Sequence, residues 1–253
     1  METPPTNDIQ APVNLDHLLG RGDIWLGRNK QPQLHVVISS GNELLDAALL
    51  GGWPSGSLLE MCQRGPVGCE WLLLHSALLT QSSKPIFLLN PPFVPFAPAL
   101  VDLGFDLDRI YLVRTKTSTE FVNAFVELAR SSQCGALLAW QPKDGLTYTE
   151  LRKFSLACAQ GEGIYSLFRP LTAQKESSPA SLRVAVGIKE SNIQISIFKQ
   201  RGMLESHDNH VHIALPHELD GHLPLNQLLD TDIPGLPKPR RRTFANVIPL
   251  RRR

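Results

Sequence analysis

The sequence contains few cysteines, and their spacing excludes the common cysteine-based sites. Only four of the 253 residues are cysteine, Cys62, Cys69, Cys134 and Cys158, and no two of them form a C-x-x-C pair. Zinc knuckles and dithiol redox centres need such closely spaced pairs. We therefore expect free, buried thiols in a reducing compartment.

Membrane and secretory segments are also lacking. No run approaches the ~20 apolar residues that cross a bilayer, and the first residues, METPPTNDIQAP, have neither a basic start nor an apolar stretch. The formal net charge is only +1, so the overall charge does not indicate a nucleic-acid partner. We expect a cytoplasmic protein that makes no membrane contact.

What is present is a chain of ordinary globular composition, 42% apolar and 19% charged, in which strand and helix patterns alternate. Apolar runs at 86–89, 110–113, 136–140 and 164–168 predict buried strands, and helical patterns lie at 96–103, 118–130 and 149–160. Strands separated by helices favour a mostly parallel sheet with helices on both faces. Period-two segments at 182–186 and 193–197 predict an antiparallel hairpin with one solvent face at one edge of the sheet, before a last strand at 210–215.

Local signals predict where the helices begin and how the chain divides. Asn42 is the expected N-cap of a short helix, Ser118 or Thr119 caps the helix at 118–130, and Glu150 and Lys153 form an ordinary surface pair. We expect three segments: a leader with a short helix at 1–34, an α/β core at 35–216, and a linker with a basic tail at 217–253.

The stretch 57–79 has the build of a phosphate-binding element, a strand, a glycine-proline turn and a helix. The P-loop pattern G-x-x-x-x-G-K-[ST] supplies backbone amides, a lysine for the phosphates and a hydroxyl for magnesium. Here the turn is degenerate: Gly65, Pro66 and Gly68 are followed by Cys69 and Glu70. The lysine and hydroxyl are absent, and Glu70 places a negative charge where a triphosphate needs a positive one.

The acidic residues that accompany a P-loop are also missing. ATP hydrolysis needs a carboxylate to orient water and another to hold magnesium, each after a strand of the sheet. The expected strand at 86–89 runs into Asn90, and the one at 136–140 ends on Trp140 and Gln141. We therefore predict no catalytic residue, no cofactor and no enzyme activity, and retain only weak anion binding at 65–70 as an alternative.

Five histidines near the end of the core suggest a metal site, but their surroundings do not complete one. His210 and His212 share one face of the expected strand, whereas His207, His217 and His222 lie outside it. No cysteine or nearby carboxylate completes a recognised ligand set. We predict no metal site.

The C-terminal tail is strongly basic and carries no acidic residue after position 235. Blocks of this kind often contact phosphates or acidic partner surfaces, and apolar residues between them can dock once ordered. The alternative is an unstructured, solubilising end. We predict partner or nucleic-acid binding by these residues: Lys238, Arg240, Arg241, Arg242, Phe244, Ile248, Leu250, Arg251, Arg252 and Arg253.

The segment VISSGNELLDAALLGGWPSGSLLEMCQRGPVG resembles the part of RecA recombinases that leads into the P-loop. The matching positions are Leu45, Asp46, Leu49, Gly51, Gly52, Pro54, Gly56, Glu60, Gly65 and Pro66. Together with the opening LDHLLGRGDIWLGR, the degenerate loop is similar to one branch of that superfamily, the ImuA family of translesion-DNA-synthesis-associated proteins, also labelled SulA-like. The resemblance covers about residues 13–215.

The resemblance implies a RecA-like fold and a function in the SOS response. Such a protein would be a non-catalytic adaptor in error-prone translesion synthesis and SOS mutagenesis. Its implied partners are an ImuB-type polymerase-like protein, an error-prone DNA polymerase III alpha subunit and RecA, with weak DNA contact through the basic tail. Two alternatives stay open: an SOS inhibitor of cell division of the SulA type, which binds the tubulin-like division protein, and a residual DNA-dependent ATPase.

Overall fold

The computed structural model describes residues 36–65, 69–81, 83–189, 192–201 and 209–214. The expected leader at 1–34 and the expected linker and tail at 217–253 lie outside these residues.

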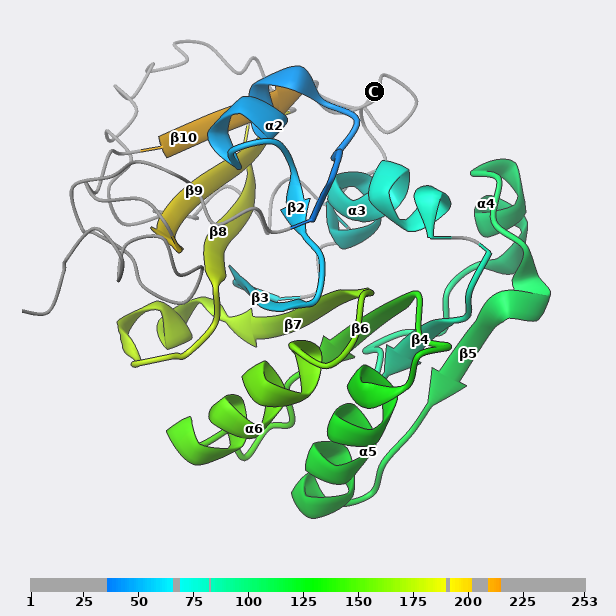
Figure 1. Ribbon diagram of the computed structural model, residues 1–253. Helices are drawn as coiled ribbons and strands as arrows, with labels where there is room; N and C mark the ends of the chain where they lie inside the picture. Colours follow the sequence, from blue (N-terminus) through cyan, green and yellow to red (C-terminus); the bar gives the residue numbers. More distant parts are fainter. Residues whose placement is uncertain (1–35, 66–68, 82, 190–191, 202–208, 215–253) are drawn as a thin grey trace, which may run out of the picture.

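The core is an eight-stranded sheet in the order β10-β9-β8-β3-β7-β6-β4-β5 (Figure 1). Every neighbouring pair from β8 to β5 is parallel, whereas β8–β9 and β9–β10 are antiparallel. The mostly parallel sheet and the antiparallel extension at one edge are thereby confirmed. The strands are β3 (Ser57–Gln63), β4 (Ile86–Leu89), β5 (Ile110–Val113), β6 (Ala136–Trp140), β7 (Ile164–Pro170), β8 (Leu182–Lys189), β9 (Asn192–Gln200) and β10 (Asn209–Ala214).

Helices cover both faces of the sheet (Figure 1). One face carries α2 (Glu43–Ala48), α3 (Cys69–Thr80) and α4 (Ala97–Asp102), and the other carries α5 (Ser118–Arg130) and α6 (Tyr148–Cys158). Two short 3-10 turns, η1 (Leu107–Arg109) and η2 (Leu171–Lys175), lie before β5 and after β7. A separate pair, β1 (Val37–Ile38) and β2 (Trp53–Pro54), was not predicted.

Two hydrophobic cores lie on opposite sides of the sheet, because successive side chains of a strand point to opposite faces. Leu59 and Met61 of β3 join α2, α3 and α4 in the first core. Leu58 joins the second, where the rings of Phe125 and Phe154 stack with their centroids 4.0 Å apart and connect α5 to α6. All seven residues of β3 are buried, as expected for a central strand covered on both faces.

The hairpin of β8 and β9 differs from the prediction in one respect. Its period-two pattern predicted one solvent face, but the polar side chains on that face are buried: Arg183 is 5% exposed and Ser196 is 6% exposed. Hydrogen bonds from Arg183 to the carbonyl oxygens of Ala173 and Glu176 bind this face to η2 and its following loop. The expectation of a wet face was therefore wrong.

Two helix starts also need correction. The N-cap of α5 is Thr117 rather than Ser118 or Thr119, and its hydroxyl accepts a hydrogen bond from the backbone N–H of Glu120. In α6 the carboxylate of Glu150 accepts from the backbone and hydroxyl of Thr147, which forms a capping box instead of the expected pair with Lys153. Asn42 caps α2 as predicted.

Candidate functional site

A crevice of about 330 Å³ lies at the carboxyl edge of the sheet, where β3, β4, β6 and β7 end. The chain leaves β4 toward α4 on one face and leaves β6 toward α6 on the other. Such a reversal opens a crevice in α/β sheets and is where their ligands bind. The lining residues are Gln63, Arg64, Gly65, Asn90, Pro92, Trp140, Gln141, Phe168, Arg169 and Pro170.

Two stacked aromatic rings form an apolar wall of the crevice. Trp140 and Phe168 stand opposite each other on the neighbouring strands β6 and β7, and their rings stack with centroids 4.7 Å apart. The indole Nε1 of Trp140 is buried and has no hydrogen-bond partner among the described residues. The stack is therefore held by ring contact and not by a polar anchor.

Asn90 joins the ends of two strands at the rim. Its backbone has φ of 53°, in the left-handed region that asparagine tolerates better than most residues. Its amide oxygen accepts from the backbone N–H of Thr115 at 2.8 Å, and its amide nitrogen donates to the Thr115 hydroxyl at 2.8 Å. Both polar ends of Asn90 are thus engaged by the segment after β5, so this side chain has a structural role.

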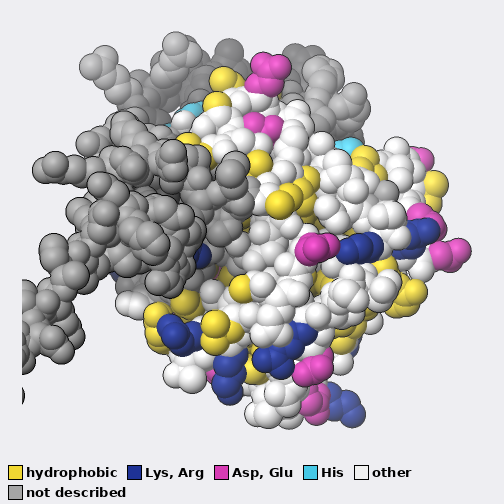
Figure 2. Space-filling view, viewed as in Figure 1, with side chains coloured by type: hydrophobic (Ala, Val, Ile, Leu, Met, Phe, Trp, Pro, Cys, Tyr) yellow, Lys and Arg dark blue, Asp and Glu magenta, His cyan; other side chains and the backbone are white. Residues whose placement is uncertain are grey.

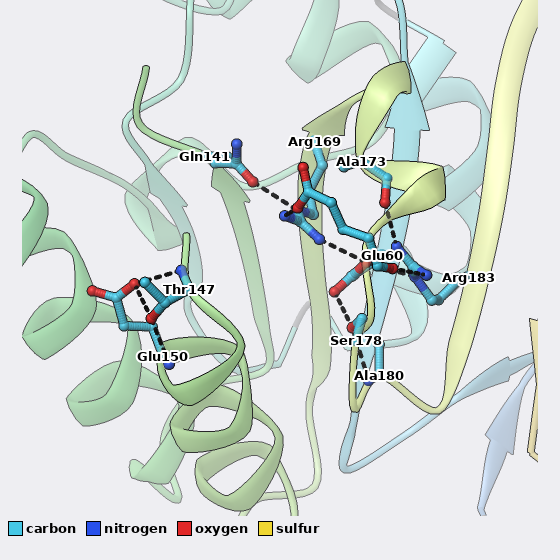
Figure 3. A network of polar contacts seen from close by, with 10 residues as sticks. Glu60, Gln141, Thr147, Glu150, Arg169, Ala173, Ser178, Ala180 and Arg183 are labelled. Atoms are coloured by element: carbon cyan, nitrogen blue, oxygen red, sulfur yellow. Dashed lines mark hydrogen bonds and ion pairs between the residues drawn. The ribbon is translucent and has the colours of Figure 1, made fainter. Parts of the chain in front are cut away.

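Beneath the crevice, charged side chains from three strands meet in a buried network (Figure 3). Glu60 of β3 accepts from Nη1 of Arg169 at 3.3 Å and from Nε of Arg183 at 2.8 Å, while the Ser178 hydroxyl bonds its other oxygen. Arg169 also donates to Glu176 at 2.7 Å. The side chains of Glu60, Arg169 and Arg183 are 0%, 1% and 6% exposed.

The charges of this network cancel, since two carboxylates face two guanidinium groups. Arg169 uses its remaining Nε donor on the amide oxygen of Gln141 at 2.6 Å, and Gln141 in turn lines the crevice. Arg183 lies over the ring of Phe198, with its guanidinium carbon 4.9 Å from the centroid. Each of the three guanidinium nitrogens of Arg169 therefore donates one hydrogen bond, and its charge is neutralised from within the protein.

Burial also shifts the pKa values of two ionisable groups next to this network, Cys62 and Lys199. Burial, with the negative charge of Glu60 as a smaller cause, raises the pKa of the Cys62 thiol to about 12. Burial also lowers the pKa of Lys199, helped by the nearby Arg183, while its ammonium donates to the Ser178 carbonyl at 2.6 Å. A thiol with a raised pKa is a poor nucleophile, so Cys62 is not a candidate for covalent chemistry.

Three of the four cysteine side chains of the sequence are described in the structure, and burial disfavours the reactive thiolate form of each. Burial raises the pKa of Cys134 to about 12 and raises that of Cys158 well above its ordinary value. These two and Cys62 are free and buried, and we refer to the three as the buried thiols. The expectation of free, buried thiols is confirmed for these positions, whereas the side chain of Cys69 lies outside the described residues.

The structure brings together only part of the predicted site. Gly65 lines the crevice, whereas Pro66 and Gly68 lie outside the described residues. Glu70 falls in the first turn of α3, but its side chain also lies outside them. The tail residues predicted to bind a partner or nucleic acid, at 238–253, are not among the described residues either.

The histidine pair occupies the strand predicted for it. On β10, His210 stands opposite Ser196 and His212 opposite Gln194. No group of three histidine, cysteine, aspartate or glutamate side chains in the described part of the chain could hold a metal ion.

Sequence reasoning missed the network of Glu60, Arg169 and Arg183, although a signal was present. Each is a charged residue in a mostly apolar strand, and such residues are almost never buried without a partner. That signal indicates that partners exist, but it does not identify them.

A comparison of the chain with protein-family models gave no match, and neither did a comparison with curated proteins. Within the described ranges, no helix combines the length and apolarity that a membrane crossing requires. The fold and the crevice together define an α/β protein with a mostly parallel sheet and a crevice at the carboxyl edge of that sheet, in which none of the described lining residues is a carboxylate.

Proposed function

We propose that the protein is a non-catalytic, RecA-like accessory factor of SOS-induced, error-prone translesion DNA synthesis. It acts as an adaptor that binds an ImuB-type polymerase-like protein and an error-prone DNA polymerase III alpha subunit, and it also contacts RecA. Two observations support the proposal. The segment around Gly51 and Gly65 resembles the part of RecA recombinases that leads into the P-loop, and the described lining of the crevice has no carboxylate.

The observation that carries the non-catalytic part is the Trp140 indole at the end of β6. An ATPase of the RecA type needs a magnesium-holding aspartate at the end of such a strand and a water-orienting acid after another. Here Trp140 is stacked on Phe168, and the residue after β4 is Asn90, which is engaged by Thr115. Magnesium requires oxygen ligands, and none of the lining residues supplies a carboxylate.

The position of the degenerate loop supports the RecA-like part. The strand that precedes it, β3, lies at the centre of the sheet between β7 and β8, and α3 follows directly. Arg64 and Gly65, the described residues after β3, thus lie at the carboxyl edge, where an α/β sheet binds its ligand. The frame of a nucleotide site is retained while the groups that perform hydrolysis are absent, which is what an adaptor built on such a frame requires.

The ATPase alternative is tested with the purified full chain. Phosphate release is measured with magnesium-ATP, with and without single-stranded DNA. We expect no release above the buffer rate in either condition, because no described residue of the crevice can hold the metal. DNA-stimulated turnover would replace the adaptor with the residual ATPase.

The adaptor function is tested by pull-down with the tagged full chain. Purified ImuB-type protein, the error-prone polymerase subunit and the tubulin-like division protein are offered separately. We expect retention of the ImuB-type protein and loss of binding when residues 236–253 are deleted. Retention of the division protein alone would favour the SulA-type inhibitor, and unchanged binding after the deletion would remove the tail from the interface.

A further inference from the structure

The crevice continues into an exposed apolar loop that the proposed function does not explain. Pro92 lines the crevice, and the next residues of the chain are exposed: Phe93 by 68%, Val94 by 73% and Phe96 by 72%. Eight of the fourteen large apolar residues exposed in the described part fall within 93–112. Single exposed apolar residues are normal, but several close together in the chain, as in Phe93, Val94 and Phe96, are typical of an interaction site.

The sequence of this loop disfavours regular secondary structure. Pro91, Pro92 and Pro95 restrict the backbone between β4 and α4 and remove three N–H donors, which disfavours a regular helix or strand in this loop. In Figure 2, apolar side chains lie between charged ones on the side of the molecule where α4 and β5 lie in Figure 1. We call residues 91–96 the apolar loop.

The charged residues of the crevice indicate which kind of ligand it binds. Arg64 is exposed at the rim and has no hydrogen bond or ion pair with the described residues. The other cation, Arg169, is already neutralised by Glu60 and Glu176. Among the described residues that line the crevice none is a carboxylate, so within this part of the chain the positive charge of Arg64 at the rim is left to be matched by an anion.

We propose that the crevice and the apolar loop form one docking site for a protein segment that carries a carboxylate beside a large apolar side chain. The apolar side chain packs against the wall of Trp140, Phe168 and Pro92, and the carboxylate pairs with the guanidinium of Arg64. The rest of the segment covers Phe93 and Phe96. Arginine suits this role because its planar fork binds a carboxylate through two hydrogen bonds.

A protein segment fits this surface better than a nucleotide does. A nucleotide would fill the crevice and leave the apolar loop exposed, whereas a protein partner buries both. Apolar surface removed from water is the main driving force of such association. This inference rests on the proposed adaptor function, because the docking site is the surface by which the adaptor recognises its partner.

A library of random short peptides displayed on phage, selected against the full chain, tests the site. We expect enrichment of peptides in which Asp or Glu lies next to Phe, Leu or Trp. A selected peptide should change the tryptophan fluorescence of the wild type, and that change should be lost in Trp140→Phe. No enrichment, or enrichment without this composition, would overturn the proposal.

Point variants locate the binding on the surface. Arg64→Glu and the double variant Phe93→Ser, Phe96→Ser should each weaken the selected peptide about tenfold or more. The matched controls Arg152→Glu and Leu156→Ser, exposed on α6 of the other face, should bind as the wild type does. Equal binding by all variants places the peptide elsewhere and contradicts the site.

Two further experiments, a competition with nucleotides and a pull-down with the partner, distinguish the remaining interpretations of the crevice. AMP or a short oligothymidylate that competes with the peptide and alters Trp140 fluorescence would assign the crevice to nucleotides and overturn the proposal. In the pull-down, an ImuB-type protein retained equally by wild type and Arg64→Glu would reject the docking site but keep the adaptor function. If the wild type retains no ImuB-type protein while the peptide results hold, the adaptor function fails and the docking site stands.

Discussion

The buried network under the crevice makes a sharp prediction for Glu60→Gln. Glutamine keeps the shape of glutamate and one acceptor oxygen, so the substitution removes a charge and little else. Glu60 is fully buried and accepts from both Arg169 and Arg183, at 3.3 and 2.8 Å. Without it, Glu176 is the one carboxylate left in the network to face two buried guanidinium groups.

The expected loss follows from that imbalance. Removing one partner of a buried ion pair costs about 3–5 kcal/mol, because the remaining charge stays desolvated. Arg169 keeps its bond to Glu176 and Arg183 keeps two carbonyl acceptors, so we take the lower end, about 3 kcal/mol. With a urea m value of about 2 kcal/mol/M, the midpoint of unfolding should fall by about 1.5 M.

Urea unfolding of the full chain, followed by circular dichroism, measures this shift. Glu176→Gln is the matched control, because that side chain is 53% exposed and bonds the same arginine; its cost should be about 1 kcal/mol or less. The double variant Glu60→Gln, Arg183→Met restores the balance of charge and should recover part of the loss, seen as coupling in a double-mutant cycle. A cost for Glu60→Gln no larger than that of Glu176→Gln would refute the reasoning.

Two further results are expected from tryptophan and cysteine chemistry. Trp140→Phe should lower the free energy of unfolding less than Trp53→Phe does in the same assay. Trp53 is fully buried, and its Nε1 donates to the Leu73 carbonyl at 3.1 Å. Nε1 of Trp140 has no partner among the described residues, so its replacement loses no hydrogen bond. Equal costs would contradict this. The buried thiols should resist iodoacetamide at pH 9 in the native chain and react in urea, as peptide mass spectrometry reports. Their raised pKa values stabilise the fold fully below pH 9.0, the ordinary thiol value, and this contribution is lost as the pH rises toward about 12. Native labelling of these thiols would show that the region opens readily.

The regular part of the fold could be predicted because each element carries its own local pattern. The helix at 118–130 has an apolar stripe with the helical period, and the strand at 136–140 is a short apolar run, so both were found at their observed bounds. The crevice itself was not predicted, but the proximity of two of its lining residues can be explained by the same patterns. Once the strands are parallel, their ends must meet at one edge, which brings Asn90 and Trp140 to the same site.

The remaining features depend on contacts between distant residues, which local patterns do not encode. The alternation around Arg183 indicates which residues share a face but not what covers that face. Its partner Glu60 lies 123 residues earlier in the chain. The strands β1 and β2 contain two residues each, too few for any period to be recognised. They approach closely because Gly52, with φ of 139°, has no Cβ to meet the Ile38 carbonyl.

The charges beneath the crevice are balanced by residues of the protein itself. A site that binds magnesium and a triphosphate gathers cations and carboxylates that are neutralised only when the ligand is present, and unpaired buried charges destabilise the empty protein. Here the two buried arginines are matched by Glu60 and Glu176, and the stacked rings of Trp140 and Phe168 occupy the wall where the strand ends. The charge that remains unmatched, Arg64, is at the exposed rim, where water solvates it at little cost. A carboxylate of a partner could therefore bind Arg64 and leave again without disturbing the core, as a reversible adaptor contact requires.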